Sequence, residues 1–106
     1  MALTKDFTDT VRARAQSDPE FRAELLREAI QCLISGDLDT GKAVLRDYIN
    51  ATLGFAELGA RTQRSPKSLM RMFGPKGNPQ ARNLFEIIDC LQRNEGIHLE
   101  VRCARG

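Results

Sequence analysis

The sequence predicts an all-α domain of five or six helices, and three observations lead to this. Apolar residues recur every three or four positions through most of the chain. A capping residue followed by proline begins two segments, at Asp18-Pro19 and Ser65-Pro66. Glycines follow several of the apolar segments and mark helix ends. The chain has 106 residues, of which 42% are hydrophobic and 28% charged, as expected of one folded domain.

Two helices are predicted in the N-terminal third. Thr4 is placed to cap the first, which reaches about residue 15, and Asp18 with Pro19 begins the second. Gly36 marks the end of the second helix. A wide apolar stripe at helical spacing supplies its buried face: Phe21, Leu25, Leu26, Ala29, Ile30, Leu33 and Ile34. Residues 1–36 are therefore interpreted as an N-terminal helical extension.

Residues 37–94 are predicted to form the core of the domain. A third helix begins at Asp39 or Thr40 and ends at Gly54. Two short helices follow, over residues 55–62 and 66–73. The segment 74–79 contains two glycines and two prolines, so it is a loop. A last helix over residues 80–93 carries an apolar set at regular helical spacing: Leu84, Ile87, Ile88 and Leu91.

Residues 95–106 form a tail with a different pattern. Ile97, Leu99 and Val101 alternate with polar residues, which is the period of a strand. A single strand has no partner in a helical chain. The sequence therefore leaves two interpretations open, a disordered tail and a strand that pairs with another chain.

The two short helices carry the candidate functional site. They are joined by a turn of about three residues, 63–65, which is the arrangement of a helix-turn-helix. The outer positions of the second helix include Lys67, Ser68 and Arg71, whose side chains can hydrogen-bond to base edges in the major groove. They lie near the helix N-terminus, the part of a recognition helix that contacts bases. We therefore predict that these three residues read DNA sequence.

The charge distribution supports an interaction with nucleic acid. Residues 58–85 contain six basic side chains and no acidic one, whereas the rest of the chain holds ten basic and fourteen acidic residues. A basic segment that coincides with the two short helices is expected for phosphate binding. Arg64, Lys76, Asn78 and Gln80 are the predicted phosphate contacts. Such contacts fix the position of a protein on the duplex without reading its sequence. The alternative is that the basic face binds an acidic partner protein.

Other classes of function have weak support in the sequence. His98 is the only histidine, so it cannot form a catalytic dyad or a multi-histidine metal site with another. The three cysteines lack the spacing of a zinc site or a disulfide framework. We predict a protein that is not an enzyme, has no cofactor or metal, and does not interact with membranes. The absence of an apolar run or leader pattern predicts a cytoplasmic location.

Residues 55–91 resemble the lambda-repressor-like (XRE) helix-turn-helix family. The resemblance lies in Leu58 to Arg61, Ser65 to Phe73, Gly77-Asn78-Pro79, and the apolar pattern of the last helix. The serine, basic residue, serine and leucine of residues 65–69, followed by Arg71 and the later Gly-Asn-Pro, are similar to the HigA-like antidote proteins of toxin–antitoxin modules.

This resemblance implies a fold and a set of partners. It implies a homodimer that binds a palindromic operator, represses its own operon and, if a toxin is encoded beside it, binds that toxin. Two recognition helices on half-sites about 34 Å apart would also multiply specificity. The chain departs from the family in the turn, which has Gln63 and Arg64 where glycine and an aliphatic residue are usual, and at Gly59, where alanine is usual.

Overall fold

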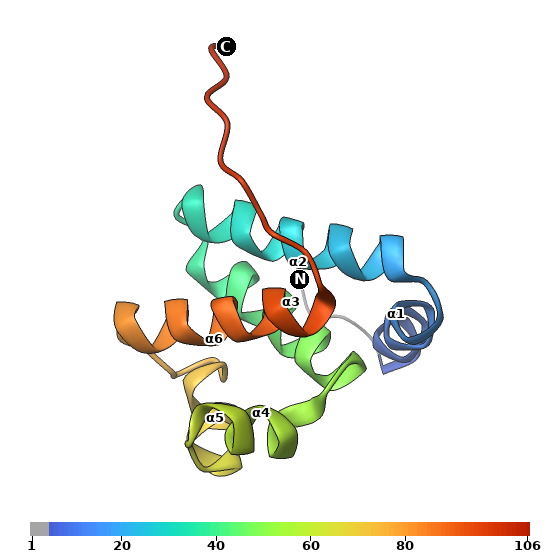
Figure 1. Ribbon diagram of the computed structural model, residues 1–106, viewed down its shortest axis with the longest axis vertical. Coiled ribbons are helices and arrows are strands. Elements are labelled where there is room, and N and C mark those ends of the chain that lie inside the picture. Colours follow the sequence, from blue (N-terminus) through green and yellow to red (C-terminus); the bar gives the residue numbers. More distant parts are fainter. Residues whose placement is uncertain (1–4) are drawn as a thin grey trace.

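The computed structural model describes residues 5–106 and confirms the all-α prediction (Figure 1). Its helices are α1 (Lys5–Ser17), α2 (Pro19–Ile34), α3 (Leu38–Ala51), α4 (Gly54–Thr62), α5 (Pro66–Met72) and α6 (Ala81–Glu95). Helices α4 and α5 lie together at one end of the molecule, and α2 lies at the other (Figure 1). The predicted cap at Thr4 falls outside the described residues.

The capping residues explain where the helices begin. A carboxylate oxygen of Asp18 accepts hydrogen bonds from the amides of Glu20 and Phe21, at 3.1 and 3.2 Å. The Ser65 hydroxyl accepts one from the amide of Ser68 at 3.0 Å. Both predicted starts are confirmed.

The predicted start of α3 was wrong by one or two residues. Asp37 is the capping residue, and its carboxylate accepts a hydrogen bond from the amide of Thr40 at 3.2 Å. The chain turns at Gly36, which has a φ of +88°, and this turn places Asp37 at the N-terminus of α3. Its far end also differs, because α3 ends at Ala51 and Gly54 is the first residue of α4.

One hydrophobic core joins five of the helices. Leu26 and Ala29 of α2 are fully buried in the same cluster as residues of α3 to α6. The segment predicted as an extension therefore packs into the core of the domain. The other buried members of the cluster are Leu45, Tyr48, Ile49, Phe55, Leu58, Leu69, Phe73, Leu84, Ile87, Ile88 and Leu91.

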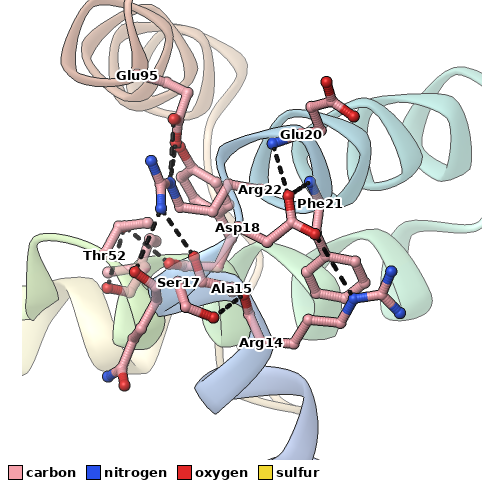
Figure 2. A network of polar contacts seen from close by, with 12 residues as sticks. Arg14, Ala15, Ser17, Asp18, Glu20, Phe21, Arg22, Thr52 and Glu95 are labelled. Atoms are coloured by element: carbon pink, nitrogen blue, oxygen red, sulfur yellow. Dashed lines mark hydrogen bonds and ion pairs between the residues drawn. The ribbon is translucent and has the colours of Figure 1, made fainter.

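A polar network fastens the N-terminal helices to α6. The Arg22 Nε donates to both carboxylate oxygens of Glu95 at 3.1 Å, and Arg22 Nη1 donates to the carbonyl oxygen of Ala15 at 3.0 Å. Figure 2 shows Arg22 reaching from α2 between Glu95 and the end of α1. The hydroxyl of the buried Tyr48 also donates to Glu95. The Glu95 side chain is only 6% exposed, and these donors offset the cost of burying its charge.

The C-terminal tail forms no strand in the described chain. The amide of Ile97 donates to the carbonyl oxygen of Gln92, and the amide of Leu99 donates to the Gln92 side chain at 2.8 Å. The last part of the tail extends away from the body of the molecule (Figure 1), and Val101 is 79% exposed. The rest of the described chain contains no strand with which the tail could pair.

Candidate nucleic-acid interface

The turn between α4 and α5 sets the position of the second short helix. Gln63 adopts a left-handed conformation, with φ 57° and ψ 45°, and ends α4. The next amide, that of Arg64, donates to the carbonyl oxygen of Gly59 at 2.9 Å. A Cβ atom on Gly59 would lie 2.5 Å from the carbonyl oxygen of Arg64, so only glycine allows this approach. The three departures from the pattern that the sequence resembles, Gly59, Gln63 and Arg64, therefore lie at one turn.

Helix α5 presents its predicted base-reading residues to the outside. Leu69 is fully buried and Phe73, just after the helix, is 1% exposed, so these two anchor one face. Lys67, Ser68 and Arg71 lie on the exposed part of the helix. All three side chains are therefore accessible to a ligand that approaches the exposed face of α5.

Two basic residues of α3 hold the loop that follows α5. Lys42 is only 3% exposed, and its Nζ donates to the carbonyl oxygens of Gly74 and Gly77 at 3.1 and 2.6 Å. Arg46 Nη1 donates to the carbonyl oxygen of Phe73 at 3.3 Å. Positive side chains at the carboxyl end of a helix are favoured by its dipole. Neither residue was predicted from the sequence, although Lys42 occurs three residues before the buried Leu45, at an inward position of α3.

The loop also packs tightly against the end of α5. A Cβ atom on Gly77 would overlap the carbonyl oxygens of Arg71 and Met72. The glycine therefore allows the backbone of the loop to cross α5 at close range. This contact places Lys76 and Asn78 beside the exposed residues of the helix.

A groove of about 360 Å³ brings most of the predicted site together. It lies between α5, the loop and the beginning of α6. Five of the seven predicted site residues line it: Ser68, Arg71, Lys76, Asn78 and Gln80. Lys67 is exposed in the first turn of α5, outside the lining of the groove. Residues of α5, the loop and the start of α6 thus form one continuous surface.

Arg64 lies elsewhere and has partners within the protein. Its Nη2 donates to Asn83 Oδ1 at 2.9 Å and to the carboxylate of Glu86, and its Nη1 donates to the carbonyl oxygen of Thr62. Its side chain is 19% exposed. Arg64 therefore braces the α4–α5 turn against α6. Asn83 and Glu86 are about twenty residues away in sequence, so no local pattern reveals these partners.

Acidic residues just outside the 58–85 segment neutralise part of its charge. Arg61 Nε pairs with Glu57 at 2.9 Å, and Arg61 Nη1 donates to Asn94 at 2.8 Å. Glu86 pairs with Arg64. Within the described chain, the other four basic residues of the segment form no ion pair: Lys67, Arg71, Lys76 and Arg82. These four lie on α5, the loop and the first turn of α6, and all are exposed.

The beginning of α6 adds a second source of positive potential. Gln80 precedes the helix in an extended conformation, and its side chain makes no capping hydrogen bond. The first turn contains Arg82 and no acidic residue. Free amides at a helix N-terminus, together with its dipole, favour an anion. Here they adjoin the groove that Gln80 lines.

A second hollow on the surface has a different chemistry. It measures about 470 Å³ and lies between the end of α4, the turn and α6. Glu86 and Asp89 line it together with Arg61, Arg64 and Arg93. Carboxylates facing the hollow would repel phosphate, so the groove beside α5 is the better candidate for a nucleic acid.

Comparisons with protein-family models, curated proteins and solved structures give no significant match. None of the helices in the described part of the chain combines the length and the hydrophobicity that a membrane-spanning segment needs. No cluster of three or more histidine, cysteine, aspartate or glutamate side chains in that part of the chain is suited to hold a metal ion.

Proposed function

We propose that the protein is a sequence-specific, DNA-binding transcriptional regulator and not an enzyme. The observation that carries the proposal is the grouping of four exposed, unpaired basic residues around the second of two short helices: Lys67, Arg71, Lys76 and Arg82. Phosphate binding needs positive side chains that are free of carboxylate partners. A helix that is anchored on one face and basic on the other suits the major groove.

The proposed contacts fall into two sets. Lys67, Ser68 and Arg71 on α5 would contact base edges, because arginine and lysine donate to guanine and serine can donate or accept. Lys76, Asn78 and Gln80, on the loop and at the start of α6, would contact phosphates and fix the position of the helix on the duplex.

The proposed biological role is that of a cytoplasmic, autorepressing antitoxin. It rests on the resemblance of residues 55–91 to the HigA-like antidotes. The same resemblance supports a homodimer on a palindromic operator and a toxin protein as a further partner. The rest of the chain, outside residues 58–85, has a surplus of acidic residues, which supports a separate surface for a protein partner.

A binding titration tests the proposal. The purified protein is titrated against its own upstream DNA and against a scrambled duplex of equal length, at low and high salt. We expect tight binding to the upstream DNA alone, weakening steeply as salt rises. Equal and weak binding to both duplexes would contradict sequence-specific regulation. No binding at low salt would favour the alternative, an acidic protein partner for the basic surface.

A further inference from the structure

Three exposed apolar side chains surround one groove at the other end of the molecule. Ile34 of α2 is 60% exposed, Phe85 of α6 is 65% exposed, and Val101 of the tail is 79% exposed. They line a groove of about 330 Å³ whose wall also contains Leu99 and Ile88 and, at its polar edge, Arg27, Glu100 and Arg102. Large apolar side chains that gather in one exposed patch usually mark a binding surface.

The tail that borders this groove has the chemistry of an unpaired strand. In an extended chain, Ile97, Leu99, Val101 and Cys103 point to one side, and His98, Glu100 and Arg102 to the other. Beyond Leu99, the backbone of the tail makes no hydrogen bond to the rest of the described chain. An extended segment with free amides and carbonyls is a template for pairing with another segment.

The tail is complementary to a second copy of itself. In an antiparallel pair with Val101 on the two-fold axis, Glu100 lies opposite Arg102 of the second copy, and the reverse pair forms as well. Leu99 then faces Cys103 on the apolar side. Centring the pair on Glu100 or on Arg102 places like charges opposite each other. A shift by one residue mixes the apolar and polar sides.

We infer that this surface binds a second copy of the chain, whose tail pairs antiparallel with this one along the groove. The paired tails satisfy each other's backbone groups, and their apolar sides cover Phe85 and Ile34 in both subunits. Figure 1 shows the tail extending from the end of the molecule opposite α4 and α5. The inference rests on the homodimer of the proposed function but concerns a different surface from the DNA-binding residues, and its test uses no DNA, so dimer pairing and DNA binding can fail separately.

A charge-reversal experiment tests the pairing and its register. Glu100→Arg places arginines opposite each other in the dimer, and Arg102→Glu places glutamates opposite each other. Cross-strand pairs of like charge are destabilising, and two such pairs form in each dimer. We expect each variant alone to weaken the dimer at least about tenfold, measured by sedimentation equilibrium.

Mixing the two variants provides the decisive control. In the heterodimer, the arginine introduced at position 100 of one variant lies opposite the glutamate introduced at position 102 of the other. The unchanged Arg102 of the first lies opposite the unchanged Glu100 of the second, so every pair is again of opposite charge. We expect the mixture to regain wild-type affinity, whereas an effect confined to a single chain would not be reversed by mixing. A monomeric wild type, unaffected single variants, or a mixture that stays monomeric would each overturn the inference.

A second pair of variants tests the apolar side. Val101→Asp is expected to abolish dimer formation without changing the circular dichroism spectrum, because the side chain is exposed in the single chain. Met70→Asp is the matched control, since Met70 is also an exposed apolar residue, 52% exposed, but lies on α5. Equal effects of the two substitutions on the dimer would contradict the assignment of the tail.

Discussion

Arg61 and Arg71 both lie on short helices of the candidate interface, yet their surroundings differ. Arg61 is paired with Glu57 and bonded to Asn94, whereas Arg71 has no ion-pair partner in the described chain and lines the groove beside α5. A cation that already has a carboxylate partner gains less from a phosphate or a base. The four unpaired basic residues therefore carry the proposed interaction, and the six counted in the sequence do not contribute equally.

Replacing Arg71 tests this distinction directly. Arg71→Ala is expected to weaken binding to the preferred DNA by about 1–3 kcal/mol and to reduce the preference over a scrambled duplex, because a base contact is lost. Arg61→Ala is the matched control and should change affinity little, since an exposed ion pair contributes little. Both are measured by fluorescence anisotropy. If Arg71→Ala keeps the sequence preference intact, α5 is not the recognition helix.

Lys76 is expected to behave differently from Arg71. Lys76→Ala should weaken binding to all duplexes alike and make the salt dependence of log K shallower by about one unit, because one phosphate contact is lost. The measurement is a series of titrations over a range of salt concentrations. A variant that loses sequence preference instead would place Lys76 at a base.

At the scale of the elements, the interface depends on the turn before α5 and the loop after it, because α5 is not stable alone. A helix of seven residues is too short to be stable by itself. The close approach at Gly59 fixes its beginning, and Lys42 fixes the loop after its end. These contacts place the helix and the loop at one groove.

Lys42→Met removes the loop's support while keeping the length of the side chain. The carbonyls of Gly74 and Gly77 then lose their donor in a partly buried place, and we expect the free energy of unfolding to fall by about 1–3 kcal/mol. Denaturant unfolding measures this. Lys67→Met is the control with the same change of charge, and its stability should match wild type because Lys67 is exposed. Wild-type stability in Lys42→Met would refute the bracing role.

Local signals predicted most of the elements, and long-range contacts account for what they missed. Asp18 and Ser65 were identified as caps because the residues that they cap follow within three positions. The partners of Arg64 and Lys42 lie about twenty to thirty-five residues away, so no local pattern reveals them. The loop residues of the groove were predicted as phosphate contacts. Their packing against α5 was not, because it depends on the close approach of the backbone at Gly77.

At the scale of the whole molecule, Glu95 connects the N-terminal helices to α6. Burial, and then the hydrogen bond and charge of Glu95, raise the pKa of Tyr48 above its ordinary value near 10. Because the neutral phenol is favoured in the folded state, its contribution to stability is fully present below about pH 10. That contribution is lost as the pH rises above this value.

This linkage predicts a decline in stability at alkaline pH. Above about pH 10, the Tyr48 linkage should lower the free energy of unfolding by up to about 1.4 kcal/mol per pH unit. Tyr48→Phe should be less stable at neutral pH, since Glu95 loses a donor, but its alkaline decline should be flatter. Denaturant unfolding over a pH series measures both. Tyr48 is the only tyrosine, so tyrosinate absorbance reports its ionisation, and titration near pH 10 in the folded protein would contradict this account.

We propose that α5, the following loop and the start of α6 form one DNA-binding surface. The most direct measurement is a nuclear magnetic resonance titration of the isotope-labelled protein with its upstream duplex. We predict that the largest amide shift changes fall on residues 66–83 and that the tail, residues 97–106, shows little direct change. Shift changes that concentrate on α2 or the tail, or that are absent at low salt, would contradict the claim.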